Sequence, residues 1–105
     1  MKVNVQSVNF NVDQKLLEFI QERLDKLENF YDKIIYADVF LKVQQTSDKE
    51  NKTTEVLLSI PGDEIMVKKT AKTFEEGIDS CERALQRQLI KRKDKLSDHS
   101  GKKIA

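Results

Sequence analysis

TFEEGIDSCERALQRQLIKRKDKL, residues 73–96, predicts a long amphipathic helix that anchors the fold. Its apolar residues recur at spacings of three and four or their sums, as they do on a helix that buries one face. They are Phe74, Ile78, Cys81, Leu85, Leu89 and Leu96. The pattern Thr73-x-x-Glu76 is a capping box and marks the start of the helix. Gly77 costs about 1 kcal/mol of helix propensity relative to alanine, and nothing in the local sequence explains it.

The same stretch carries a second, basic pattern. The basic residues are Arg83, Arg87, Lys91 and Lys95, which recur every four residues, with Arg92 and Lys93 beside them. On a helix this spacing places four cations along about 18 Å. If all six met a phosphate, log K would fall against log salt with a slope of about −4 to −5. We therefore expect a polyanion partner, RNA first, read through its shape and backbone because no RNP aromatic motif or GXXG loop is present.

Charge is segregated along the chain, although the net charge is only +1. From Arg83 onward there are eight Lys or Arg and two Asp, whereas residues 1–82 hold eleven Lys or Arg and sixteen Asp or Glu. Such asymmetry indicates a polyanionic partner. A solvated helix face would give the same pattern, so charge alone leaves both interpretations open.

Length and composition predict one small domain in a reducing compartment. The chain has 105 residues, enough for a single modest core. Its one cysteine, Cys81, cannot form a disulfide within the chain, which fits the cytoplasm. The N-terminus has no apolar signal-peptide region, and no stretch approaches the roughly 18 apolar residues of a membrane span. We expect a cytoplasmic protein without a membrane partner.

The patterns along the chain predict an α+β fold in the order β-α-β-β-β-α. A helix follows the Asp13 cap and runs to about Tyr31, and Pro61-Gly62-Asp63 supplies a hairpin turn. The four alternating segments that read as strands are residues 2–8, 34–45, 53–60 and 64–70. A strand-helix-strand unit makes the first two strands parallel, and the others add as antiparallel hairpins. Because one sheet face alternates as apolar, we expect a four-stranded mixed sheet with both helices packed on that face.

The residues near the C-terminus predict where the folded domain ends. Small and polar residues after Leu96 suggest that the last helix frays there. We expect one domain over residues 1–97 and a disordered tail over residues 98–105.

Two cations of the first helix, Arg23 and Lys26, are three residues apart and share one face. Glu22, Asp25 and Glu28 lie close in sequence and can pair with them. From spacing alone, surface pairing is the favoured interpretation of these two residues.

Residue patterns that carry catalysis are absent from the sequence. The only histidine, His99, lies in the predicted tail, and Cys81 lies on the apolar stripe, where a cysteine behaves as a small core hydrophobe. No zinc-type Cys/His spacing and no glycine-rich phosphate loop occurs. We predict a protein that is not an enzyme and needs no cofactor, metal ion or small-molecule substrate.

Several motifs together resemble the ribosome hibernation promoting factor and ribosome-associated inhibitor A family, in its short form, over residues 1–99. The motifs are Arg87-Gln88-Leu89-x-Lys91-x-Lys93-Asp94-Lys95-Leu96, Arg23-Leu24-x-Lys26-Leu27-Glu28, Gly62-Asp63-Glu64-Ile65 and Gly77-Ile78-Asp79. The resemblance implies a stationary-phase or stress factor that binds the small ribosomal subunit over the messenger and transfer RNA sites and blocks translation by occupancy. It implies that basic positions face ribosomal RNA at Arg23, Lys26, Arg87, Lys91, Lys93 and Lys95. The physical argument alone adds Arg83 and Arg92.

The chain departs from the family pattern at two positions. The family often has a lysine at the position of Ala84, and Arg83, one residue earlier, is an imperfect replacement. Lys69 falls on an inward-phased strand position that the family usually fills with a small residue. It either ends the strand or extends its amine outward. No ribosome-dimerising domain follows, so we expect a monomer off the ribosome and a second factor wherever ribosomes pair.

Two other functions stay open from the sequence. One is a general binder of structured RNA. The other is a protein-interaction module that uses the outer sheet face at Phe40, Leu57 and Met66.

Overall fold

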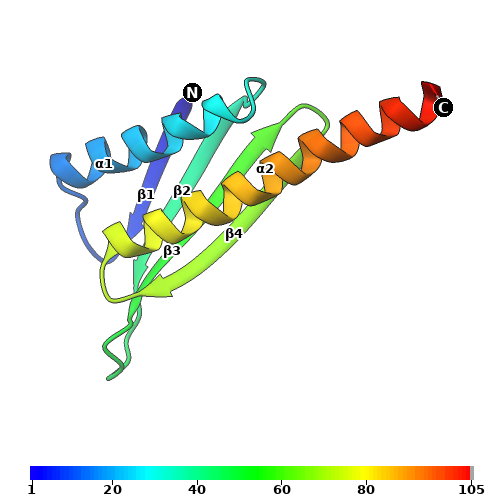
Figure 1. Ribbon diagram of the computed structural model, residues 1–105. Helices are drawn as coiled ribbons and strands as arrows, with labels where there is room; N and C mark the ends of the chain where they lie inside the picture. The colour runs from blue at the N-terminus through cyan, green and yellow to red at the C-terminus, as the bar shows by residue number, and fades with distance from the viewer. Residues whose placement is uncertain (105) are drawn as a thin grey trace.

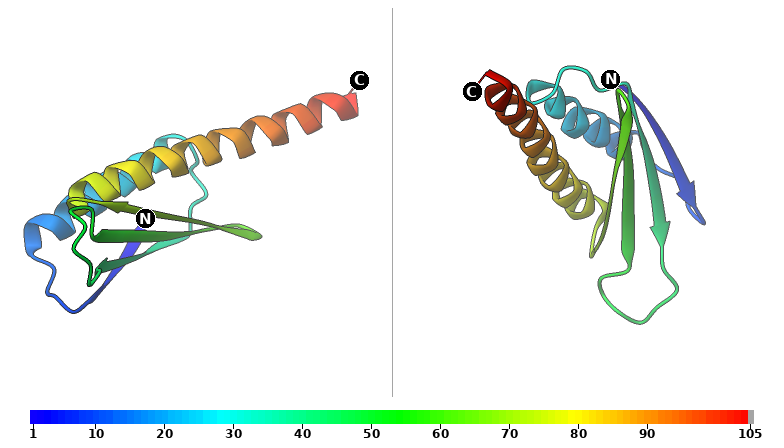
Figure 2. Two further views of the ribbon diagram at one scale, coloured as in Figure 1. Left: turned by 90° about the horizontal axis from the view of Figure 1, so that it is seen from below. Right: turned by 90° about the vertical axis from the view of Figure 1, so that its right-hand side faces the viewer.

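Four strands form one twisted sheet, and two helices lie across the same face of it in the computed structural model (Figure 1; Figure 2). The structure describes the backbone of residues 1–104 and the side chains of residues 1–93. The elements are β1 (Lys2–Val8), α1 (Gln14–Asp25), the short 3-10 helix η1 (Lys26–Asn29), β2 (Tyr36–Val43), β3 (Lys52–Ile60), β4 (Asp63–Ala71) and α2 (Phe74–Ile104). This is the predicted α+β fold, with the predicted order of strands and helices.

The sheet has the strand order β1-β2-β3-β4, so β1 and β4 are its edges. Strand β1 pairs with β2 in parallel, because α1 carries the chain back across the sheet between them. Strands β2, β3 and β4 pair as antiparallel neighbours. Gly62, in the turn between β3 and β4, has a φ of 77°, which glycine adopts without steric cost. The mixed sheet predicted from the sequence is confirmed.

The core lies between the sheet and the helices, and the predicted apolar stripes supply it. On the inward sheet face Val39, Val56 and Leu58 are fully buried. On α2 the fully buried residues are Ile78, Cys81, Leu85 and Leu89. Burying one such side chain stabilises the fold by about 1.5–3 kcal/mol, so this face holds α2 firmly against β3 and β4.

Helix α1 begins as predicted and ends earlier. The Asp13 carboxylate accepts a hydrogen bond from the Leu16 backbone N–H at 2.7 Å. The helix ends at Asp25 and tightens into η1, whereas the sequence predicts a helix to about Tyr31. The Leu27 carbonyl accepts from the backbone N–H groups of Phe30 and Tyr31 at 3.0 and 3.1 Å. This tighter turn satisfies the last carbonyls while Leu27 stays buried.

Three strand lengths differ from the prediction, with β3 longer by the single residue Lys52. Strand β2 is shorter than the predicted 34–45, because Ile34 and Ile35 belong to the preceding connection. Strand β4 is longer than the predicted 64–70, because its pairing with β3 extends to the pair of Lys52 and Ala71. Lys69 therefore lies inside a strand and does not end it.

A close approach between α2 and β3 explains Gly77. A Cβ atom at this position would lie 2.5 Å from the Thr54 Oγ1 atom and 3.2 Å from the Thr54 Cβ atom. One turn later, the buried Cys81 thiol donates to the Thr54 carbonyl oxygen at 3.7 Å. Only glycine lets the helix axis come this near to the strand.

Helix α2 continues as helical backbone to Ile104, past the end near Leu96 that the sequence predicts. Residues 97–104 contain no proline, and Gly101 alone lowers their helix propensity strongly, by about 1 kcal/mol. The side chains of Lys95 and His99, and Ala105 altogether, lie outside the described part of the chain. No helix in the described backbone is long and apolar enough to cross a membrane.

Candidate nucleic-acid interface

The basic residues of α2 do not share one face, because a step of four residues turns a helix about 40° past a full turn. Arg83, Arg87, Lys91 and Lys93 are exposed, and Arg92 is partly buried. The basic residues that the sequence places along one side of the helix therefore fall into separate groups. Arg83 pairs with Asp79, which also contacts Arg23 of α1, whereas Arg87 and Lys91 line the side that faces β4.

Arg23 lies between the two helices and is held by carboxylates of α2. Its Nη1 atom donates to Asp79 Oδ1 at 2.8 Å and to Glu82 Oε1 at 3.2 Å. The guanidinium carbon also lies 5.0 Å from the centre of the Phe19 ring, which adds a cation–π contact. Surface pairing was favoured for Arg23, but its partners come from α2, 56 and 59 residues away, and not from its own helix. These carboxylates interrupt a basic surface that would join Arg23 to the α2 cations.

Two of the three acidic neighbours that the sequence offers to Arg23 pair with another group. Asp25 and Glu28 accept hydrogen bonds from the N-terminal ammonium of Met1, at 3.4 and 2.8 Å. The hydrogen bond to Glu28 is the main reason why the pKa of this ammonium is raised above its usual 8.0. Lys26, the first residue of η1, is exposed.

Two further predicted site residues are held by carboxylates. Arg83 pairs with Asp79 one turn earlier on α2, so Asp79 joins Arg23 and Arg83 at once. The Nη2 atom of Arg92 lies 2.6 Å from the Oδ2 atom of Asp63, the first residue of β4 after the turn from β3. The Glu64 backbone N–H and, next, the Arg92 guanidinium hold the pKa of Asp63 below its usual 3.8. Both contacts would have to open before these arginines could bind phosphates.

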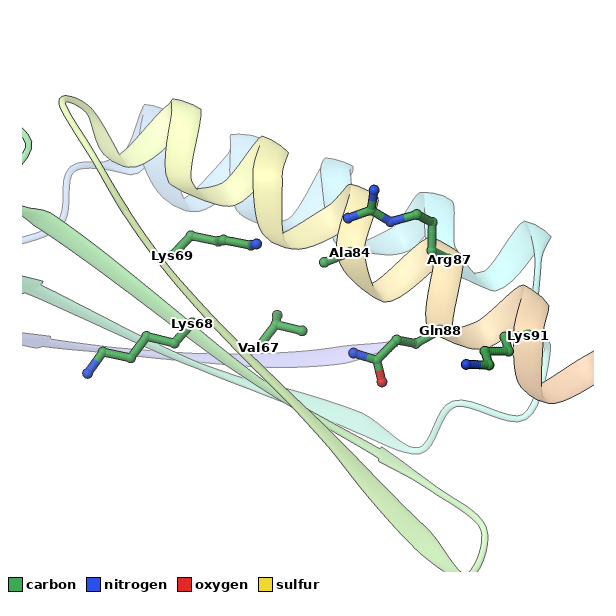
Figure 3. Close-up of a pocket in the computed structure, with 7 residues that line it drawn as sticks. All are labelled: Val67, Lys68, Lys69, Ala84, Arg87, Gln88 and Lys91. Carbon is green, nitrogen blue, oxygen red and sulfur yellow. The ribbon is translucent and has the colours of Figure 1, made fainter.

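Arg87 and Lys91 differ, because the described residues offer them no ion pair. They line an open groove of about 480 Å³ between α2 and the edge strand β4. Its walls are Val67, Lys68, Lys69, Ala84, Arg87, Gln88 and Lys91 (Figure 3). No carboxylate occurs among these lining residues. Among the described residues, the groove is therefore the part of the predicted site whose lining holds several cations and no carboxylate.

Sequence reasoning did not place Lys69 in a candidate site. Its neighbours at the inward positions of β4, Val67 and Ala71, are buried, whereas Lys69 is only half-buried. In Figure 3 its side chain runs toward α2, and its amine points toward Ala84. Lys68 points to the other side of β4. A lysine at an inward-phased strand position was the signal that could have found this residue.

Lys93 lies on the other side of α2. It lines a shallow hollow with residues 28–33, which follow the end of α1 and include Glu28, Asp32 and Lys33. The side chain of Lys95, the last predicted member of the basic stripe, lies outside the described residues. The structure therefore places Arg87 and Lys91 together along the groove, and Lys91 also lines a second hollow with Arg92 and Asp63. Arg23, Arg83 and Lys93 do not line either of these hollows.

The described residues offer little for catalysis or metal binding. Residues 1–93 contain no cluster of three or more His, Cys, Asp or Glu side chains that could hold a metal ion. Burial raises the pKa of the Cys81 thiol to about 11, and the nearby Lys69 charge opposes this rise. The thiol is thus protonated at neutral pH and unsuited to nucleophilic attack.

Comparison with known proteins agrees with the fold. A ribosomal subunit interface protein from Coxiella burnetii superimposes with a TM-score of 0.79 and 18% identity, over 90% of this chain and 99% of that one. The N-terminal domain of Thermus thermophilus Protein Y gives 0.76 and 17%, over 87% and 98%. At these identities the likeness concerns the fold.

The curated proteins found by sequence comparison are more similar in sequence than these two structures. The chain is 33% identical to the ribosome hibernation promoting factor of Escherichia coli K12 over 99 residues, which cover 94% of this chain and all of that protein. It is also 33% identical to the factor of the same name from Pseudomonas putida over 95 residues, 90% of this chain and 89% of that one.

These relatives confirm the family that the sequence motifs suggest. A family of ribosome-associated proteins also supports the prediction that the chain is not an enzyme. Residues 3–97 match the family described as Sigma 54 modulation protein / S30EA ribosomal protein, and the chain belongs to this ribosome hibernation factor family.

Proposed function

We propose that this protein inhibits translation by binding the small ribosomal subunit at the messenger and transfer RNA sites of idle ribosomes. It acts in the cytoplasm, by occupancy, and it is monomeric away from the ribosome. Relatives named ribosome hibernation promoting factor support the ribosome as partner, and they are matched over nearly the full chain.

The observation that carries the proposal is the placement of Arg87 and Lys91. Both cations are on a helix that is held to the sheet by the fully buried residues Ile78, Cys81, Leu85 and Leu89, so their backbone positions are fixed. Both border a groove without a carboxylate among its lining residues. Cations with these properties bind phosphates without first breaking an ion pair, and they release counterions when they do so.

Shape supports inhibition by occupancy. Helix α2 has 31 residues, which is roughly 46 Å of helix, and Figure 1 shows it extending well past the sheet. A rigid rod of this length, anchored by a small domain, can fill a channel that messenger and transfer RNA would otherwise enter.

The two alternatives have less support. A general binder of structured RNA would use the same cations, so only a comparison of RNA partners separates it from the proposal. For a protein-interaction module on the outer sheet face, Met66 is 54% exposed, but Leu57 beside it and Phe40 two strands away are partly buried. This leaves a small apolar contact area.

Cosedimentation with purified small subunits tests the proposal. We expect the wild type to travel with the subunits at low salt and the double variant Arg87→Glu/Lys91→Glu to stay in the supernatant. The matched control is Lys42→Glu/Lys49→Glu, which changes the net charge equally at two exposed sites away from α2. Equal loss in both double variants would mean that net charge alone governs binding.

Salt dependence and competition sharpen the result. Arg87, Lys91 and Lys93 alone predict a slope of log K against log salt of about −2 to −3. A slope near −4 would mean that two further cations, such as Arg83 and Arg92, also meet phosphates. If unrelated duplex RNA competes as well as subunits do, the protein is a general RNA binder and the proposal is wrong.

A further inference from the structure

Resting on the proposed function, we infer that Lys69 contacts RNA, and that Lys69 and Arg87 together hold one backbone phosphate over Ala84. The site is the groove between β4 and α2.

The first step is the position of Lys69. It lies between Val67 and Ala71 on the inward face of β4, and both of these are buried. A lysine amine is stable at such a position only if it reaches water or a partner. No carboxylate pairs with it among the described residues. Its amine extends along the groove toward α2, where water or an anion can reach it (Figure 3).

The second step is the direction of Arg87. Long side chains on a helix point back toward the N-terminus and lie over the preceding turn. The guanidinium of Arg87 accordingly points to the space above Ala84 (Figure 3). Ala84 is buried at the base of the groove and has only a methyl group, so its side chain does not fill the space between the helix and Lys69.

The third step is electrostatic. Two cations directed at one open space repel each other, and an anion between them removes this cost. Arginine offers a planar pair of N–H donors to a phosphate, and lysine offers a point charge. A phosphate over Ala84 would satisfy both.

The groove favours a phosphate that belongs to a polymer. It is open, and it continues past Ala84 to Gln88 and Lys91, whose side chains also point into it (Figure 3). Beyond the first phosphate, the Gln88 amide can bind the next sugar of an RNA strand, and the Lys91 ammonium can bind the next phosphate. A closed pocket around one anion is not present at this place in the described structure.

The test compares Lys69→Met, which keeps the length of the stem and removes the charge, with Lys42→Met on the outer sheet face. We expect Lys69→Met to weaken binding to small subunits about tenfold at low salt and to make the salt slope shallower by roughly 0.7–0.9. The Lys42→Met variant should bind as the wild type does. Thermal melting of each variant checks that the fold is intact.

The outcomes separate this inference from the proposed function. If Lys69→Met binds as tightly as Lys42→Met, whereas Arg87→Glu/Lys91→Glu does not bind, the phosphate site is wrong and the proposed function stands. If the wild type does not bind small subunits at all, the proposed function fails.

A second measurement tests, independently of ribosome binding, whether RNA binds in the groove. An RNA hairpin is titrated into ¹⁵N-labelled wild-type protein, and the amide resonances of Lys69, Ala84 and Arg87 should shift together. Inorganic phosphate at the same phosphate concentration should shift them far less. Equal shifts with inorganic phosphate, or RNA-induced shifts confined to other residues, would overturn the assignment of this groove to an RNA backbone.

Discussion

Asp79 joins two arginines, so its replacement should move stability and RNA affinity in opposite directions. It accepts from Arg23 of α1 at 2.8 Å and also pairs with Arg83 of its own helix. Asp79→Asn keeps the size and one oxygen acceptor and removes the charge. The ion pairing between α1 and α2 then depends on Glu82, whose Oε1 atom lies 3.2 Å from Arg23 Nη1.

The loss of stability follows from these contacts. A hydrogen bond to a charged group contributes about 1.5–3 kcal/mol, and asparagine retains part of it. The Arg83 side chain is 71% exposed, so its pairing adds less than about 1 kcal/mol. We expect a fall of about 1–2 kcal/mol in the free energy of unfolding, or roughly 5–15 °C in Tm.

The effect on binding has the opposite sign. Without the Asp79 charge, Arg83 can turn toward a phosphate. The slope of log K against log salt should become steeper by roughly 0.7–0.9 for one new phosphate contact. Affinity for small subunits at low salt should rise accordingly.

Thermal melting and salt-dependent subunit binding measure the two effects in one preparation. Asp48→Asn, in the exposed loop between β2 and β3, makes the same charge change away from α2 and should alter neither quantity noticeably. A lower Tm with unchanged or weaker binding would refute the idea that Asp79 restrains RNA-binding arginines. An unchanged Tm would refute the bridge between α1 and α2.

Two further predictions concern the packing of α2. Gly77→Ala places a methyl group 2.5 Å from Thr54 Oγ1, and such overpacking costs about 1–3 kcal/mol against about 1 kcal/mol of gained helix propensity. Thermal melting should therefore show destabilisation by Gly77→Ala in the wild type and a smaller destabilisation in a Thr54→Ala background, where only the contact with the Cβ atom of residue 54 remains; the same effect in both would exclude the contact with Oγ1. Because Cys81 is buried and its pKa is about 11, a thiol reagent at pH 8 should label it only as fast as the protein unfolds, and fast labelling of the native protein would contradict this.

The fold could be predicted because its signals are local. Apolar residues at helical or alternating spacing determine which face of each element is buried, and the Asp13 cap and the Gly62 turn mark ends that depend on nearby atoms. The ends of helices and strands could not be predicted where they depend on hydrogen bonds to residues of another segment. The early end of α1 depends on hydrogen bonds to Leu27, and the length of β4 depends on its pairing with β3.

The candidate site could be predicted only in part. Spacing identified Arg87 and Lys91, because exposure on a helix follows from the position of its apolar stripe. It could not reveal that Asp79 and Glu82 hold Arg23, or that Asp63 holds Arg92, since these partners are far apart in sequence and meet only in the folded chain. The pair of Asp79 and Arg83, one turn apart on α2, is the one contact of this kind that spacing alone allows. Spacing also could not show that Lys69 of a strand points at the space over Ala84 of a helix.

By itself, the sequence determined the α+β class, the buried faces, the family and the presence of a basic helix, because each depends on residue type and short-range periodicity. The tertiary structure alone decided which cations are available. Availability depends on Coulomb interactions between side chains that folding brings within a few ångströms of each other. In residues 73–96, the basic stripe is therefore a set of separate cations, and the pair that faces β4 is the part best placed for RNA.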